Sequence, residues 1–395
     1  MTLMGHNVAR GAGPVFVGVA TMLGAGAFGS ISPAVADAGW WSLAGLALVA
    51  VVAALTAVSI ADLTAQSGSR GVFRHVRDRH GVWPGRLAGV LDLGGRVVGL
   101  AAVAGLAGAY FGSVGPIIAV VLVVIACAAH QVGIGPGHRL WLILASMAIV
   151  TLVLVVIAGL AIAPAAALTI TDSSVAGSDD PTGILAAAGL LFLGFGAIRH
   201  RSPRWRTPML SVAAVAVVLL VITVVALRQL GGPRLALSSA PLGDTLRAAD
   251  GASLLPVLML GLLAGTLLAL YDLVGGAIET VGELAAAGEV PDVPIRFRPV
   301  GVGVGAAGLA VLLTPVAALG LAATLLLGSY AFVNSASRSL CRAERSVWLR
   351  TGCCGLALSV IVGVNIAVVA LLGALAVLLV GTLLCTVSAR SAESV

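Results

Sequence analysis

The chain has 395 residues, of which 59% are hydrophobic and only 10% are charged, and its mean hydropathy is +1.12. Soluble proteins carry roughly 25% charged residues, so this composition excludes an ordinary soluble domain and indicates membrane-spanning helices. All 22 basic residues are arginine, which excludes a mechanism that needs a titrating lysine. We interpret the net charge of +6 as a basic cytoplasmic face, with no nucleic acid as partner.

Apolar runs recur from one end of the sequence to the other, without the polar alternation of barrel strands. We predict an all-α polytopic membrane protein whose residues 1–395 form a single transmembrane domain. The twelve expected spans lie at residues 14–36, 41–63, 87–110, 115–130, 139–163, 183–198, 207–229, 253–280, 299–315, 317–336, 351–368 and 369–388.

The first span contains the stretch "MLGAGAFG" (22–29), with glycines at 24, 26 and 29. A glycine destabilises a helix interior by about 1 kcal/mol relative to alanine. Two interpretations remain open. Small residues let membrane helices pack closely, or the helix is unwound there and its exposed amides attract an anion such as a carboxylate.

The arginines of the polar loops indicate how the chain is oriented in the membrane. With the N-terminus inside, the inner segments hold 18 arginines and the outer loops hold three, Arg228, Arg234 and Arg247. Cytoplasmic loops are enriched in arginine and lysine, so we expect both termini in the cytoplasm of a bacterial cell.

The sixth span repeats the glycine pattern of the first in "FLGFGAI", which contains Gly194 and Gly196. Interrupted segments at corresponding places in two halves of a chain indicate a transporter site near the membrane midplane. Five spans separate the two segments, so the halves have opposite orientations, as an inverted repeat requires. The match between the two segments favours unwound helices at both.

Ionisable residues inside spans are functional candidates by default. Asp272, beside Tyr271 in the eighth span, would bind a proton or a cation, or would be a structural carboxylate held by hydroxyls or an arginine. Asp92 and Arg96 lie four residues apart on one helical face, and form either a structural pair or a gate.

The remaining polar residues are expected to be structural. Asp62 ends the second span near loop arginines, and Glu279 and Glu283 are interpreted as charges of the cytoplasmic face. The six histidines and five cysteines have no metal-ligand spacing, so we expect no metal site, no disulfide and no cofactor.

Several motifs, in this order, resemble the amino acid–polyamine–organocation superfamily of permeases. The segment 24–28, "GAGAF", is similar to its first-span signature. The segments 59–81, 190–198 ("LLFLGFGAI") and 201–208 ("RSPRWRTP") are similar to its second-span, sixth-span and seventh-span elements. The chain departs from that pattern at Ile198, Arg199 and Glu279, where the family carries an aromatic residue, an acid and an arginine.

The resemblance implies two inverted five-helix repeats, the leucine-transporter-like fold, with discontinuous first and sixth helices. It implies that Gly24, Ala25 and Gly26 meet a substrate carboxylate. It also implies that the backbone around Gly194, Phe195, Gly196 and Ile198 meets the amino group. The coupling and gating candidates are Asp272, Tyr271, Asp92 and Arg96.

The sequence thus predicts a non-enzymatic secondary transporter of amino acids or related amines, surrounded by membrane lipid. Coupling to protons or exchange is favoured over coupling to sodium. The compact layout is also similar to the small amino-acid exporters of the superfamily, so the direction of transport stays open. Two other classes remain as alternatives: a non-transporting membrane sensor or scaffold, and a polytopic membrane enzyme.

Overall fold

The computed structural model describes residues 3–68, 70–133, 139–163, 176–196, 204–347 and 350–393. Throughout these ranges the regular structure is helical. The α-helices are α1 (Leu3–Gly26), α2 (Ile31–Ala38), α3 (Ser42–Ser67), α4 (Val72–His80), α5 (Val82–Gly108), α6 (Gly115–Val132), α7 (Arg139–Ala161), α8 (Ile184–Leu191), α9 (Leu193–Gly196), α10 (Arg206–Leu230), α11 (Gly232–Ala236), α12 (Pro241–Ala248), α13 (Leu255–Ala286), α14 (Arg298–Leu312), α15 (Pro315–Arg338), α16 (Thr351–Val364) and α17 (Val368–Glu393).

Seven helical segments of the described chain are long and apolar enough to cross a membrane. They are Ile31–Ser67, Val82–Val132, Arg139–Ala161, Arg206–Leu230, Ala252–Ala286, Pro315–Arg338 and Val368–Ala389. Four shorter apolar helices are Val15–Gly26, Pro181–Gly196, Arg298–Leu312 and Thr351–Val364. The count therefore differs from the twelve expected spans, because several apolar runs form short helices and others join across a kink.

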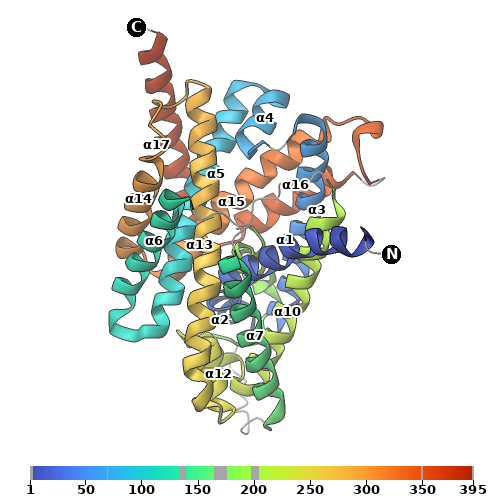
Figure 1. Cartoon of the computed structure of the whole chain (residues 1–395), viewed down its shortest axis with the longest axis vertical. Helices are drawn as coiled ribbons and strands as arrows, with labels where there is room; N and C mark the ends of the chain where they lie inside the picture. Colours follow the sequence, from blue (N-terminus) through green and yellow to red (C-terminus); the bar gives the residue numbers. More distant parts are fainter. Residues whose placement is uncertain are drawn as a thin grey trace.

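Helix α13 stands along the long axis of the molecule with α5 packed beside it, and α15 packs on α5 (Figure 1). Helix α1 runs across this axis and packs against α13, α10, α7 and α9 (Figure 1). A large apolar cluster fills the middle of the bundle, and Met22, Phe192 and Phe195 are among its fully buried side chains. The interrupted helices α1 and α9 therefore lie in the centre of the protein.

Two ends of the molecule are distinguished by their short helices. Helix α12 lies at one end and α4 at the other (Figure 1). The end with α4, the C-terminal part of α15 and the N-terminal part of α16 carries Arg70, Arg77, Arg86, Arg338 and Arg350, and we call it the arginine-rich end. The sequence assigns these short helices to loops. The structure corrects this for residues 72–80, which form α4, and for residues 232–248, which contain α11 and α12.

Candidate functional site

The first span is interrupted at the glycine-rich stretch. Helix α1 ends at Gly26 and α2 begins at Ile31. The turn between them contains the bonds Ala27 N to Leu23 O (2.7 Å) and Ser30 N to Gly26 O (3.2 Å), while the amides of Phe28 and Gly29 find no acceptor among the described residues. The Ser30 hydroxyl donates back to Gly26 O, so it does not cap α2. The positive N-terminal end of α2 therefore lies at the interruption, next to two amides without an acceptor in the described part of the chain.

A second interruption lies in the sixth span. Helix α8 ends at Leu191, and the single turn of α9 follows at Leu193–Gly196. The amides of Phe195 and Gly196 both bond to Phe192 O at 2.8 Å. The predicted contact residue Ile198 lies outside the described residues, and so does Arg199.

The two interruptions touch each other through their glycines. An ideal Cβ on Gly26 would lie 2.7 Å from the Cα of Gly194, and one on Gly194 would lie 3.0 Å from the Cα of Gly26. Gly24 packs in the same way against the backbone of Gly265 in α13. The glycines thus allow close helix packing at the same place where the helix is interrupted, and binding of an anion by the amides there stays a prediction.

The other predicted contact residues share this packed environment. Ala25 and Phe195 are buried, and Gly196 lies against the ring of Phe192. Their assignment to substrate contact stays a prediction.

Two tyrosine hydroxyls bind the carbonyls that the interruptions leave free. Tyr110 donates to Phe28 O at 2.6 Å, and Tyr330 in α15 donates to Gly196 O at 2.9 Å. Both tyrosines are buried. A buried carbonyl without a partner is costly, so these hydroxyls stabilise the interrupted geometry. No local pattern in the sequence indicates either tyrosine, because each lies more than 80 residues from its acceptor.

The end with α12 is closed by hydrogen bonds to the interrupted first span. The Ser32 hydroxyl in α2 lies 2.7 Å from both Leu235 O and Ser238 O, next to α11. The Tyr110 hydroxyl also accepts a bond from Leu242 N in α12 at 3.3 Å. Helix α2 and the α11–α12 segment are therefore joined at this end.

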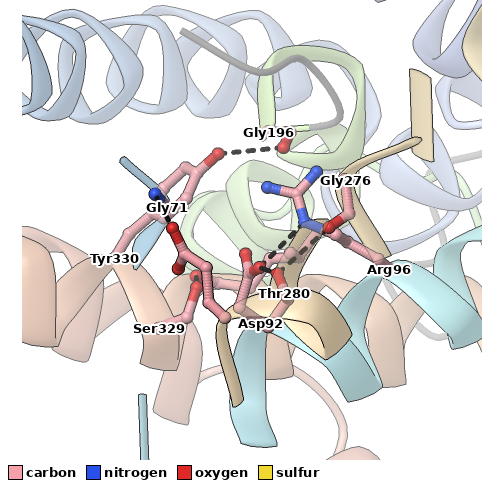
Figure 2. A network of polar contacts seen from close by, with 10 residues as sticks. Gly71, Asp92, Arg96, Gly196, Gly276, Thr280, Ser329 and Tyr330 are labelled. Carbon is pink, nitrogen blue, oxygen red and sulfur yellow. Dashed lines mark hydrogen bonds and ion pairs between the residues drawn. The ribbon is translucent and has the colours of Figure 1, made fainter. Parts of the chain in front are cut away.

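Asp92 and Arg96 form a buried pair below the second interruption. Figure 2 shows Arg96 Nε donating to Asp92 Oδ2 at 2.9 Å, with Thr280 Oγ1 donating to the same oxygen at 2.6 Å. Tyr330, which holds Gly196, belongs to the same cluster of side chains. Asp92 Oδ1 and Arg96 Nη1 are buried and have no hydrogen-bond partner among the described residues. The predicted i,i+4 pairing is confirmed, and Thr280 is a further partner that the sequence does not indicate.

Tyr271 and Asp272 have different surroundings although they are adjacent. The Tyr271 ring stacks on His130 at 3.8 Å between centroids and lies 4.3 Å from Trp141. His130 Nε2 is 2.7 Å from the carbonyl of Tyr271. Asp272 is only partly buried and interacts electrostatically with Arg96 and Tyr330. This charge is therefore part of the same electrostatic environment as the Asp92–Arg96 pair.

Acidic side chains tie loops to helices at the arginine-rich end. Glu289, which no pattern in the sequence indicates, accepts from Arg86 at 2.6 Å and from Arg77 at 3.0 Å. Glu283 accepts from Gly71 N at 2.6 Å (Figure 2). Asp62 accepts from the amide of Ser346 at 3.0 Å and also from its hydroxyl; its partner is thus a loop serine rather than the expected arginine.

His75 is buried in α4, where the sequence predicts an exposed basic loop. Its Nδ1 lies 3.0 Å from the Ser67 hydroxyl, and its Nε2 has no partner among the described residues. Burial lowers the pKa of His75 from 6.5 to about 4, because the charged ring would lose its hydration. The ring is therefore neutral at physiological pH.

Comparisons with known proteins place this arrangement among membrane transporters. No family model matches the sequence. Over 352 residues the chain is 32% identical to an uncharacterized transporter of Mycobacterium bovis. The alignment covers 82% of this chain and 78% of that transporter. Uncharacterized transporters from two strains of Mycobacterium tuberculosis match with the same identity and coverage.

A solved structure shares the fold. It is the crystal structure of a mutant of the Eremococcus coleocola manganese transporter, which superposes with a TM-score of 0.60 over 96% of this chain and 94% of that chain, at 12% identity. Together with the apolar helices, these likenesses support a multi-pass membrane protein. The identity to the mycobacterial proteins, over most of both sequences, shows that the chain belongs to their family of transporters.

Proposed function

We propose that the protein is a secondary active transporter that moves small amino acids or related amines across the bacterial cell membrane by alternating access. The observation that carries this proposal is the meeting of the two helix interruptions at Gly26 and Gly194. The amides of Phe28 and Gly29 suit a carboxylate. In the second interruption Phe192 O and Gly196 O already accept hydrogen bonds, so an ammonium group would bind other backbone carbonyls there. An α-amino acid carries both groups on one carbon.

The proposal includes a leucine-transporter-like architecture of twelve spans with both termini in the cytoplasm. Residues 14–163 and 183–336 would form two five-helix repeats of opposite orientation. The interruptions after Gly26 and after Leu191 support this, because each lies in the first span of its repeat. The arginine-rich end would then face the cytoplasm.

The contacts at the α12 end support a conformation that is closed to the outside. On the α12 side, Ser32 and Tyr110 connect the first span to the α11–α12 segment, which would close the external entrance. On the other side, α1 runs across the bundle instead of along it (Figure 1). Breaking the contacts at the α12 end while the opposite end closes would expose the Gly26–Gly194 region to one side of the membrane at a time.

The manganese transporter that shares the fold makes divalent metal the competing substrate class. Manganese favours carboxylate, carbonyl and water ligands. The residues of the first interruption are Ala27, Phe28, Gly29 and Ser30, which offer backbone groups and one hydroxyl instead of carboxylates. These groups fit a zwitterion better than a divalent cation.

Flux into proteoliposomes tests the proposal. The vesicles are loaded with a mixture of unlabelled amino acids, and entry of each labelled amino acid is followed with and without an inward proton gradient. Vesicles without protein and vesicles with Gly26→Leu serve as controls, and manganese entry is followed in parallel with an internal chelating dye. We expect exchange of a subset of small amino acids. Manganese entry without amino-acid exchange would overturn the proposed substrate class, and binding without any flux would favour a sensor.

A further inference from the structure

A separate polar cavity lies at the arginine-rich end, between the C-terminal parts of α3 and α15 and the N-terminus of α16. Its volume is about 370 Å³. Three arginines, Arg338, Arg345 and Arg350, line it together with Asp62, His80 and Thr351. The cavity shares no lining residue with the helix interruptions, so it is distinct from the proposed transport site.

The charge of the cavity is not balanced by the described side chains. Three arginines and one acidic residue, Asp62, line it, and Asp62 already accepts two hydrogen bonds from Ser346. No described carboxylate lies within ion-pair distance of Arg338, Arg345 or Arg350. A concave surface with uncompensated positive charge concentrates anions.

One of the arginines is held in place by the backbone. The guanidinium of Arg345 donates from Nε and Nη2 to Leu340 O at 3.1 and 2.7 Å. Its Nη1 donates to no described residue, and Arg338 and Arg350, whose side chains are exposed, line the same space. Guanidinium groups recognise phosphate oxygens with paired N–H donors, which a single ammonium group cannot do.

The start of α16 adds backbone donors to the same cavity. The helix has 14 residues and begins at Thr351, and no side chain caps its N-terminus. Thr351, Gly352 and Cys353 line the cavity; the Cys353 amide donates to Arg350 O at 3.1 Å, so the Thr351 and Gly352 amides are the ones without an acceptor among the described residues. Uncapped amides and the helix dipole favour a bound anion. The Thr351 hydroxyl accepts from Ser59 and can donate its own proton, whereas Ser337 and Ser339 already donate to carbonyls of α15.

We propose that this cavity binds a phosphate monoester through Arg338, Arg350 and the N-terminus of α16. Its volume lies within the range of about 300–1,000 Å³ that is typical of small-molecule sites. The phosphate group belongs either to a soluble organic phosphate or to an anionic lipid headgroup. The binding does not depend on which substrate the protein transports.

Helix α15 connects the cavity to the second helix interruption. Arg338 and Tyr330 both lie on α15, eight residues apart, and Tyr330 holds the carbonyl of Gly196. Thr351 contacts Ser59 of α3, with 3.5 Å between the hydroxyl oxygens. A phosphate that bridges α15 and α16 would therefore restrict movement of the helix that contacts the second interruption.

Calorimetric titration of the full-length protein tests the proposal at constant ionic strength. Glycerol 3-phosphate is titrated into protein in neutral detergent, and phosphatidic acid is offered in phosphatidylcholine nanodiscs. Arg338→Gln and Arg350→Gln are compared with Arg247→Gln, an exposed arginine at the other end of the molecule. We expect saturable binding that weakens at least tenfold in the two cavity variants and is unchanged in Arg247→Gln.

The pattern of binding identifies the source of the phosphate. Binding of glycerol 3-phosphate supports a soluble ligand, and binding of phosphatidic acid alone supports a lipid headgroup. Ser339→Asp, which places a negative charge in the cavity wall, is expected to abolish both. The proposal is overturned if neither probe binds, or if the cavity variants and Arg247→Gln bind equally well. Thermal unfolding of each variant without probe confirms that it is folded.

Discussion

The Cα of Gly194 occupies the space that a side chain on Gly26 would need, since an ideal Cβ on Gly26 would lie 2.7 Å from it. We therefore expect Gly26→Ala to force the two interruptions apart, which destabilises the protein by about 1–3 kcal/mol and strongly reduces flux. Gly308→Ala is the matched control, because nothing lies within 4 Å of its Cβ position and it is also in a helix. Thermal unfolding and proteoliposome flux measure both. Wild-type flux in a folded Gly26→Ala variant would contradict the importance of this contact.

The tyrosine hydroxyls at Phe28 O and Gly196 O make a second prediction. Tyr110→Phe and Tyr330→Phe each keep the ring but leave a buried carbonyl unpaired, which should cost about 1–3 kcal/mol of unfolding free energy. We also expect slower transport, because the interrupted geometry loses a support. Ser146→Ala is the control, since it removes an exposed hydroxyl bonded within its own helix. Equal stability of all three variants would show that the carbonyls find other partners.

The buried Asp92–Arg96 pair allows its two interpretations to be separated. Arg96→Met alone leaves Asp92 buried and unpaired, and we expect a loss of about 3–5 kcal/mol. Adding Asp92→Leu should recover most of this loss. We expect the double variant to transport at nearly the wild-type rate, as a structural pair requires. A folded double variant without flux would instead identify the pair as a gate.

Asp272 is the candidate for proton coupling. Asp272→Asn keeps the size of the side chain and removes the titrating group, so we expect flux that no longer responds to an inward proton gradient. Asp292→Asn, at a carboxylate exposed outside the helices, is the control. If Asp272→Asn retains the full response to the gradient, the proton carrier lies elsewhere.

His75 predicts a pH dependence of stability. Its pKa is about 4 in the folded protein and about 6.5 when exposed, so the unfolded state binds more protons between these values. The contribution of neutral His75 to the free energy of unfolding is fully present above pH 6.5. That free energy falls by up to about 3 kcal/mol as the pH drops towards 4. We expect His75→Leu to reduce the fall in melting temperature between pH 7 and pH 5. If the melting temperature of His75→Leu falls as much as that of the wild type, protonation of carboxylates causes the fall.

Local patterns in the sequence predict the features that depend on neighbouring residues. The glycines of 22–29 and 190–198 indicate the interruptions, and the four-residue spacing of Asp92 and Arg96 indicates their pair. Thr280 lies 188 residues from Asp92, and Tyr330 lies 134 residues from Gly196. No short-range pattern encodes such partners, because they are brought together only by helix packing.

The short helices show a different limit of sequence reasoning. Residues 72–80 are rich in charge and therefore read as a loop, yet Phe73, His75 and Val76 are buried. Their amphipathic spacing was the available signal for α4. For α11 and α12 the signal was weaker, since each has eight residues or fewer.

Helix α13 has 32 residues and is therefore about 48 Å long, which exceeds the roughly 30 Å thickness of a bilayer core. One part of it packs on Gly24 through Gly265, and another reaches Gly71 through Glu283. A tilt of about 10° around its middle would displace each end by about 4 Å. Small rearrangements beside the buried glycines would thus become measurable movements at the membrane surface, where a spectroscopic label near Ala286 could follow each transport cycle.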